Sequence, residues 1–241
     1  MATSTIKEFL VTYLMPEKCY YELFLNFHFH VPCLKFVLNK TAGFWIILDT
    51  FLAQLPQLIK MLWGGSAEGL SLSAFFLQLY GFSCPVVYAM ANNFPLFAWA
   101  DRLFTLAQTV VIVFLILHYR GDTVRGVLLL FALSGVMLLL RSYAAAAVIS
   151  VIQASSLAAF IASKVLQAIT NYHNSHTGQL STLSVLLSFA GSLGVAFVSL
   201  QENGNSPVSL SHILSACLSC VLLAQILCYK AGAVSTTKKT A

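Results

Sequence analysis

The chain has 241 residues, of which 59% are hydrophobic and 9% charged, and its mean hydropathy is +0.83. A soluble domain of this length carries far more charge, so the composition excludes a water-soluble fold. The net charge is +5, but the basic residues are dispersed and form no basic stripe with interleaved aromatics, which excludes nucleic acid as a partner. Apolar segments near the length of about 20 residues that crosses a bilayer predict an integral membrane protein, with the lipid bilayer as its first partner.

Residues 1–40 predict an amphipathic segment that lies in the membrane interface rather than crossing it. Pro16 suits the first turn of a short helix, and charged residues are spread over the first 22 positions. No apolar stretch there is followed by a small-residue cleavage site, so we expect no cleaved signal peptide. The first spanning helix would then target the chain to its membrane.

Seven membrane-spanning helices are expected, at about 42–62, 70–90, 96–118, 124–140, 147–172, 180–200 and 208–229. Gly, Asn and Pro clusters separate them, as is typical of turns between helices. The fourth span is the shortest and is bounded by Arg125 and Arg141. Without it the number of spans would be six.

An internal repeat organises these spans. An offset of 110 residues superposes Gln57 on Gln167 and Leu70-Ser71 on Leu180-Ser181. Three helices reverse the side of the membrane, so one extra helix between two copies makes the copies parallel. We therefore predict an all-α membrane protein with a 3+1+3 architecture: an interfacial segment (1–40), a first three-helix repeat (41–118), a linker helix (119–146), a second repeat (147–230) and a tail (231–241).

Polar side chains at bilayer depth are costly, which makes them candidates for function. They are Gln54 and Gln57 in the first span and Lys164, Gln167 and Asn171 in the fifth. The offset pairs Gln54 with Lys164 and Gln57 with Gln167, so these four should face one another across the central axis. They either line a pathway or join helices through hydrogen bonds.

Two other residues in the first span bear on this interpretation. Pro56 removes a backbone donor, so we expect a kink or hinge there. Asp49 lies nearer the opposite face of the membrane. We interpret it as a boundary residue with a hydrated carboxylate, and a proton-coupled pathway is the alternative.

Most of the six cysteines fall within or beside apolar spans, which indicates packing residues rather than a disulfide framework. The pair Cys217 and Cys220 lacks a second pair, and His173 and His176 lack further ligands, so no metal site is expected. No nucleophile elbow, phosphate-binding glycine loop or paired carboxylates occur. We expect a protein that is not an enzyme and has no cofactor.

The segment Leu55-Pro56-Gln57, followed by Ser66-Ala67-Glu68-Gly69-Leu70-Ser71, resembles the PQ-loop repeat family. That family includes SWEET sugar transporters, cystinosin-like exporters and, by structure, the KDEL receptors. In the second copy Leu166 stands where the proline belongs. The resemblance implies a SWEET-like fold of two parallel repeats and a role in transport.

Longer segments resemble one branch of this family, the mannose-P-dolichol utilization defect 1 subfamily. They include Pro16-Glu17-Lys18-Cys19-Tyr20, Asn92-Asn93-Phe94-Pro95, His118-Tyr119-Arg120-Gly121 and His176-Thr177-Gly178-Gln179-Leu180-Ser181. This resemblance implies a protein of the endoplasmic reticulum that luminal enzymes need in order to use dolichol-phosphate-mannose and dolichol-phosphate-glucose. These donors feed N-glycan precursor, GPI-anchor and O- and C-mannosyl synthesis. The protein would act as a lipid-sugar transporter or as an accessory whose loop contacts are Glu68, Asn92 and Asn93.

The last four residues match a dilysine retrieval signal, with Lys238 and Lys239 in the third and fourth positions from the end. Such a signal is bound by coatomer in the cytosol, which predicts a cytosolic C-terminus and, with seven spans, a luminal N-terminus. Two alternatives remain open: a SWEET-like sugar uniporter and a KDEL-receptor-like trafficking receptor. The third and seventh spans lack the asparagines that line the SWEET pocket, and a single intramembrane lysine is thin support for a receptor.

Overall fold

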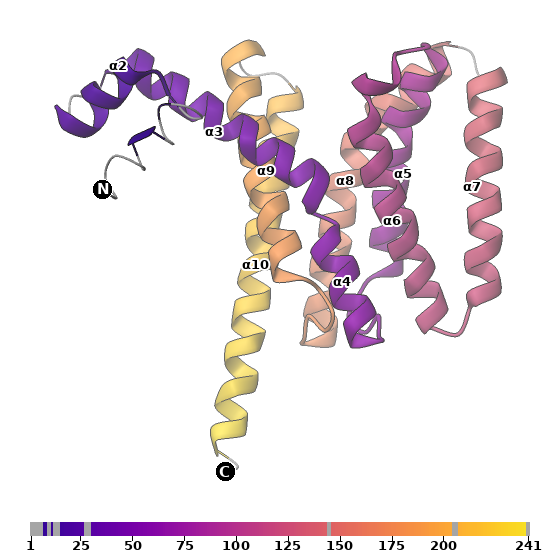
Figure 1. The fold of residues 1–241 in the computed structure, drawn as a ribbon. Helices are drawn as coiled ribbons and strands as arrows, with labels where there is room; N and C mark the ends of the chain where they lie inside the picture. Colours follow the sequence, from indigo (N-terminus) through magenta and orange to yellow (C-terminus); the bar gives the residue numbers. More distant parts are fainter. Residues whose placement is uncertain are drawn as a thin grey trace.

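The computed structural model describes residues 7, 8, 11, 15–26, 30–143, 146–203 and 207–239, and it is a bundle of long helices (Figure 1). Within these ranges seven helical segments are long and apolar enough to cross a membrane, which confirms the predicted fold class. The long helices are α3 (Val31–Leu52), α4 (Leu55–Gly64), α5 (Leu72–Ala91), α6 (Ala100–Tyr119), α7 (Thr123–Tyr143), α8 (Ala146–Asn174), α9 (Thr182–Asn203) and α10 (Pro207–Lys239). Three short elements accompany them: α2 (Glu17–Tyr20), the π-helix η1 (Tyr21–Leu25) and the 3-10 helix η2 (Leu96–Ala98).

The first span consists of two helices and begins earlier than the sequence predicted. α3 starts at Val31, with Pro32 in its first turn, where the missing N–H of proline costs nothing. Ten residues assigned to the N-terminal interfacial segment thus continue this helix. Most of the preceding residues, 1–6, 9, 10 and 12–14, lie outside the described residues. The amphipathic interpretation of 1–40 is therefore visible only in α2 and η1.

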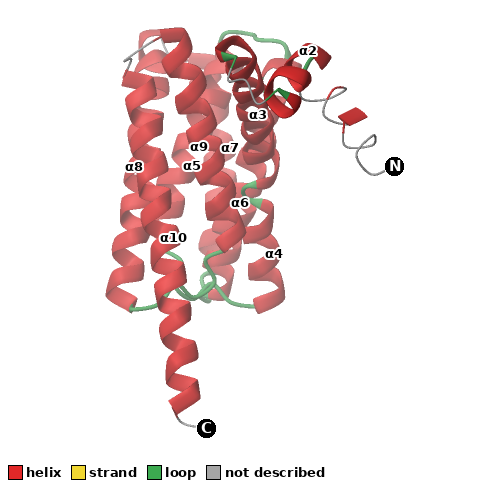
Figure 2. Ribbon diagram, turned by 90° about the vertical axis from the view of Figure 1, so that its left-hand side faces the viewer, coloured by secondary structure: helices red, strands yellow, loops and turns green. Residues whose placement is uncertain are grey.

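Successive helices alternate in direction, so the connections gather at two ends of the bundle (Figures 1 and 2). Residues 65–71, 120–122 and 175–181 lie at the end where α10 leaves the bundle, which we name the C-terminal end. α2 and residues 92–99 lie at the opposite end, which we name the N-terminal end. This grouping is the one that seven crossings require.

The two halves exchange their first helices. α3 packs mainly against α9, and α8 packs mainly against α5, although each pair joins opposite halves of the sequence. Glycines allow both close approaches: a methyl group at Gly81 would lie 3.0 Å from the Phe160 ring, and one at Gly191 would overlap the Asp49 carboxyl. Gly81 and Gly191 are themselves 110 residues apart, so the predicted offset also relates the packing sites.

α7 is peripheral, because only 6% of its spanning residues are buried. A single stripe, Leu129, Leu133 and Met137, touches the core cluster that contains the fully buried Ile112 and Ile116 of α6. The rest of the helix is exposed and apolar, as expected for a lipid-facing surface. This position agrees with a linker between two repeats.

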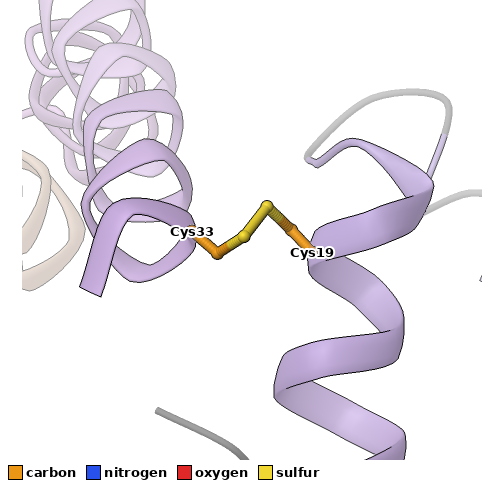
Figure 3. The surroundings of a disulfide bond; sticks show 2 residues. All are labelled: Cys19 and Cys33. Carbon is orange, nitrogen blue, oxygen red and sulfur yellow. A yellow bond between two sulfur atoms is a disulfide. The ribbon is translucent and has the colours of Figure 1, made fainter. Parts of the chain in front are cut away.

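A disulfide joins Cys19 of α2 to Cys33 of α3, with the two Cα atoms 5.3 Å apart (Figure 3). The expectation that the cysteines act only as packing residues was therefore wrong for this pair. The composition argument failed because both residues lie outside the bilayer, where the short arm turns back on the start of α3. The bond, together with buried Met15, fastens the arm to the first span.

Candidate functional site

The first span breaks at Ala53 and Gln54, just before Pro56. Carbonyl groups at the end of a helix have no partner within it and need one elsewhere at membrane depth. α6 supplies these partners, since the Thr105 hydroxyl donates to the Thr50 carbonyl at 2.7 Å and the Gln108 amide donates to that of Phe51 at 3.3 Å. The predicted interruption at Pro56 is confirmed, and its role as a moving hinge stays a prediction.

The corresponding helix of the second half, α8, is continuous from Ala146 to Asn174. Leu166 occupies the position that corresponds to Pro56, and it retains the backbone N–H that a helix needs. The two halves therefore differ in stiffness at equivalent depth.

The two conserved-offset glutamines each hold the loop of the other half. The Gln57 side chain donates to the Gln179 carbonyl at 3.0 Å and accepts from the Ser181 amide at 2.7 Å. Gln167 makes the equivalent pair of bonds, donating to the Gly69 carbonyl and accepting from the Ser71 amide, both at 2.9 Å. The side-chain amides are thus bound to backbone at the C-terminal end, which agrees with the inter-helix hydrogen-bond interpretation for these two residues.

The same two loops touch directly. The Gln179 amide donates to the Glu68 carbonyl at 2.9 Å, and a methyl group at Gly178 would overlap that carbonyl. Gly69 and Gly178 have φ values of +78° and +47°, in the left-handed region that glycine adopts most readily. Lys60 adds bonds to the Gly178 and Leu180 carbonyls at 3.2 and 2.8 Å. We refer to residues 68–71 and 178–181 together as the loop crossing; it closes the C-terminal end of the bundle.

Asn171 is fully buried and extends this network into α10. Its side chain accepts from Gln167 at 2.8 Å and donates to Gln225 at 2.9 Å, and Gln225 in turn donates to the Ala168 carbonyl at 3.0 Å. Asn171 does not line the central cavity described next. The structure therefore assigns it to the contact between α8 and α10.

A cavity of about 80 Å³ lies above the loop crossing, large enough for several water molecules. All four residues predicted to face one another line it: Gln54, Gln57, Lys164 and Gln167. Side chains from α5, α9 and α10 complete the wall, among them Gln78, Ser184, Ser188 and Ser219. Lys164 stands ten residues before the end of α8, so about 15 Å along the helix axis, near the middle of a bilayer.

The cavity combines one cation with several uncommitted polar groups. The Lys164 ammonium donates to the Ser215 and Ser219 hydroxyls, both at 2.7 Å, and to the Ser215 carbonyl at 3.2 Å. The Ser184 hydroxyl is buried and has no partner among the described residues. Within the same described ranges, no hydrogen bond engages the side chains of Gln54, Gln78 or Ser188. Such groups are available to a polar ligand.

The other predicted residues lie away from the cavity. Glu68 is at the C-terminal end, where its carboxylate lies 3.7 Å from His176 Nε2. Asn92 and Asn93 form the turn after α5 at the N-terminal end; the Asn92 side chain donates to the Tyr88 carbonyl, and Asn93 has a φ of +53°. Lys238 and Lys239 fall at the end of α10, and Thr240 and Ala241 lie outside the described residues.

Gln78, Ser188 and Gln225 were missed by the sequence analysis. Gln78 and Gln225 are amides within apolar spans, the signal that singled out Gln54. The offset of 110 pairs Gln78 with Ser188, and both line the cavity. Serine is common in membrane helices, so Ser188 carries little signal by itself.

The sequence model of the PQ loop repeat matches residues 38–98 and 148–208, which together cover just over half of the chain. The chain belongs to the PQ-loop repeat family. The two matches start 110 residues apart, the same offset that relates the two glutamines and the two loops that they hold. The chain is thus a multi-pass membrane protein with two PQ-loop repeats and a transporter-like architecture.

Proposed function

We propose that this PQ-loop protein is a component of the endoplasmic reticulum membrane that makes dolichol-phosphate-mannose and dolichol-phosphate-glucose available to luminal enzymes. The central cavity would hold the phosphate-linked sugar headgroup, by moving or presenting it. The observation that carries this proposal is a single intramembrane cation, Lys164, beside uncommitted amide and hydroxyl groups.

The chemistry of the cavity suits a sugar phosphate. An ammonium is a compact point charge that binds phosphate, and here it lies in a site largely shielded from water. Gln54, Gln78, Ser184 and Ser188 offer both donors and acceptors, which sugar hydroxyls require. The small volume fits a headgroup part rather than a whole lipid, so the isoprenoid chain would stay in the bilayer.

The predicted orientation gains support from the disulfide between Cys19 and Cys33. Disulfides persist in oxidising compartments such as the lumen of the endoplasmic reticulum and are rare in the cytosol. A luminal N-terminal end places the C-terminal end, with the loop crossing and the dilysine residues, in the cytosol. Coatomer would then reach Lys238 and Lys239.

A free-sugar uniporter is the second candidate, because the uncommitted amides and hydroxyls would suit a neutral sugar equally well. A neutral substrate, however, gives no role to a cation near mid-membrane. Loss of the Lys164 charge therefore separates the two candidates: it should abolish handling of a phosphate-linked sugar and leave that of a free sugar intact.

The test is reconstitution of the purified protein in vesicles with labelled dolichol-phosphate-mannose, followed over time for transbilayer exchange. We expect exchange with the wild type and loss of it with Lys164→Met, which keeps the length of the side chain and removes its charge. Lys35→Met is the matched control, since Lys35 is exposed on α3 far from the cavity. Donor use in deficient cells should follow the same order, at equal protein level. Normal exchange and rescue by Lys164→Met would overturn the proposed site.

A further inference from the structure

Asp49 is a second charged group inside the bundle that the proposed site leaves without a role. It lies on α3 one helical turn before Ala53, a residue of the cavity wall. Its carboxyl packs against Gly191 of α9, where any larger side chain would overlap it. Asp49 makes no hydrogen bond or ion pair with a described side chain, although a carboxylate in a membrane bundle normally has such a partner.

Asp49 and Lys164 belong to one electrostatic unit. Next to Gly191, the Ser192 hydroxyl lies 3.1 Å from that of Ser215, and Ser215 accepts from the Lys164 ammonium at 2.7 Å. The charges of Asp49 and Lys164 also act on each other directly. In a medium of low polarity an isolated charge is costly, so each of the two offsets the cost of the other when the cavity is empty.

The surroundings leave few other groups to balance this charge. The described side chains of α9 include no titratable group, and α4 carries Lys60, which is bound to the loop crossing. α6 carries Asp101 and Arg102 at its N-terminal end. His212 of α10 faces Lys164 and senses its charge.

We propose that Asp49 is the counter-charge of Lys164 and takes up one proton when an anionic headgroup binds in the cavity. The inference rests on the proposed function. When a phosphodiester reaches Lys164, the unit holds two negative charges and one positive charge in a poorly solvated place. Protonation of the Asp49 carboxylate restores neutrality, because the proton adds to the anion and leaves an uncharged carboxylic acid. Binding and proton uptake are thereby coupled.

The experiment measures affinity against pH with the purified full chain and a soluble probe, mannosyl phosphate joined to a short isoprenoid. This phosphodiester keeps one negative charge between about pH 5.5 and 8.5, so the ligand itself does not titrate in the range where perturbed carboxyl groups do. At low pH Asp49 already holds its proton, and affinity should be high and constant. As pH rises, each binding event must capture a proton, so affinity should fall by up to about tenfold per pH unit.

Asp49→Asn removes the titrating group and should bind with the low-pH affinity at every pH. Asp101→Asn is the matched control, a carboxyl of α6 outside the unit, and should keep the wild-type pH dependence. Calorimetry of the wild type in two buffers of different ionisation enthalpy counts the protons directly, so the test stands even if a variant fails to fold. One proton taken up supports the proposal.

Three outcomes overturn the coupling. They are wild-type binding without proton uptake, a pH dependence that persists in Asp49→Asn, and a pH dependence that disappears instead in His212→Gln. If the wild type does not bind the probe at any pH, the proposed function itself fails. The two failures are therefore distinguishable.

Discussion

Replacement of Gly178 by alanine should open the loop crossing, because two separate costs meet at this position. The φ of +47° lies in the left-handed region, where a Cβ atom costs about 1–2 kcal/mol. The new methyl group would also overlap the Glu68 carbonyl, so the loops must move apart. That movement weakens the bond from Gln179 to Glu68 and the two bonds from Lys60, each with a net contribution of about 1 kcal/mol.

Gly65→Ala is the matched control. Gly65 has a φ of +55°, but nothing lies within 4 Å of the added methyl group. The equivalent residue in the second half, Ser175, adopts the same φ of +55° with a side chain in place. Only the backbone cost of about 1–2 kcal/mol applies to this variant.

The expected total for Gly178→Ala is about 4 kcal/mol, which lowers the melting temperature of a chain of this size by about 8–16 °C, against about 2–8 °C for Gly65→Ala. The assay heats the detergent-purified proteins at one fixed rate and measures the monodisperse fraction by size-exclusion chromatography. Equal shifts for the two variants, or a larger shift for Gly65→Ala, would refute the steric reasoning about the loop crossing.

Three further predictions use the same kind of comparison. Gln57→Leu should destabilise the protein by about 2–4 kcal/mol because it leaves a buried backbone donor and acceptor unpaired, whereas Gln54→Leu, in the same cavity wall, removes no hydrogen bond and should stay near the wild-type melting temperature. Cys33→Ser opens a 14-residue loop and should lower the stability by about 3 kcal/mol, and non-reducing electrophoresis after thiol labelling should show one additional free thiol, at position 19. Serine at both Lys238 and Lys239 should let the protein reach later compartments, seen by microscopy, without a change in melting temperature.

Each of these has a contradicting result. Similar melting temperatures for the Gln57 and Gln54 variants would show that the bonds to the opposite loop contribute nothing to stability. Unchanged thiol labelling of the Cys33 variant would mean that the pair is reduced in the cell. Complete retention of the double serine variant would mean that the tail carries no retrieval signal, and glycosylation of an acceptor sequence appended to the tail would reverse the orientation.

The repeat and the spans could be predicted because their signals are local and strong. Apolar length defines each helix, and the offset that pairs Gln57 with Gln167 is visible in the letters alone. The same pairing brought four polar residues around one cavity. Their partners could not be predicted, since a glutamine shows only that it needs a hydrogen bond. That each glutamine reaches the loop of the other half follows from the exchanged packing of α3 and α8.

The disulfide and the role of Gly178 also depend on tertiary contacts. Cys19 and Cys33 are separated by a proline-free stretch that sequence alone reads as amphipathic, and only the turn of the arm brings them together. Gly178 looks like an ordinary loop glycine until Glu68 is placed against it. In both cases the deciding neighbour comes from another element, and no periodic pattern identifies it.

The peripheral position of α7 means that this helix contributes an odd crossing rather than a surface. Any apolar helix of similar length would give the same parity, provided that it keeps a stripe such as Leu129 and Leu133 toward the core. Deleting it would deliver the second half upside down and separate every pair of partners that the repeat aligns. Substitutions should therefore accumulate more freely in α7 than in the other spans, and two chains divided within it should still reassemble into one bundle.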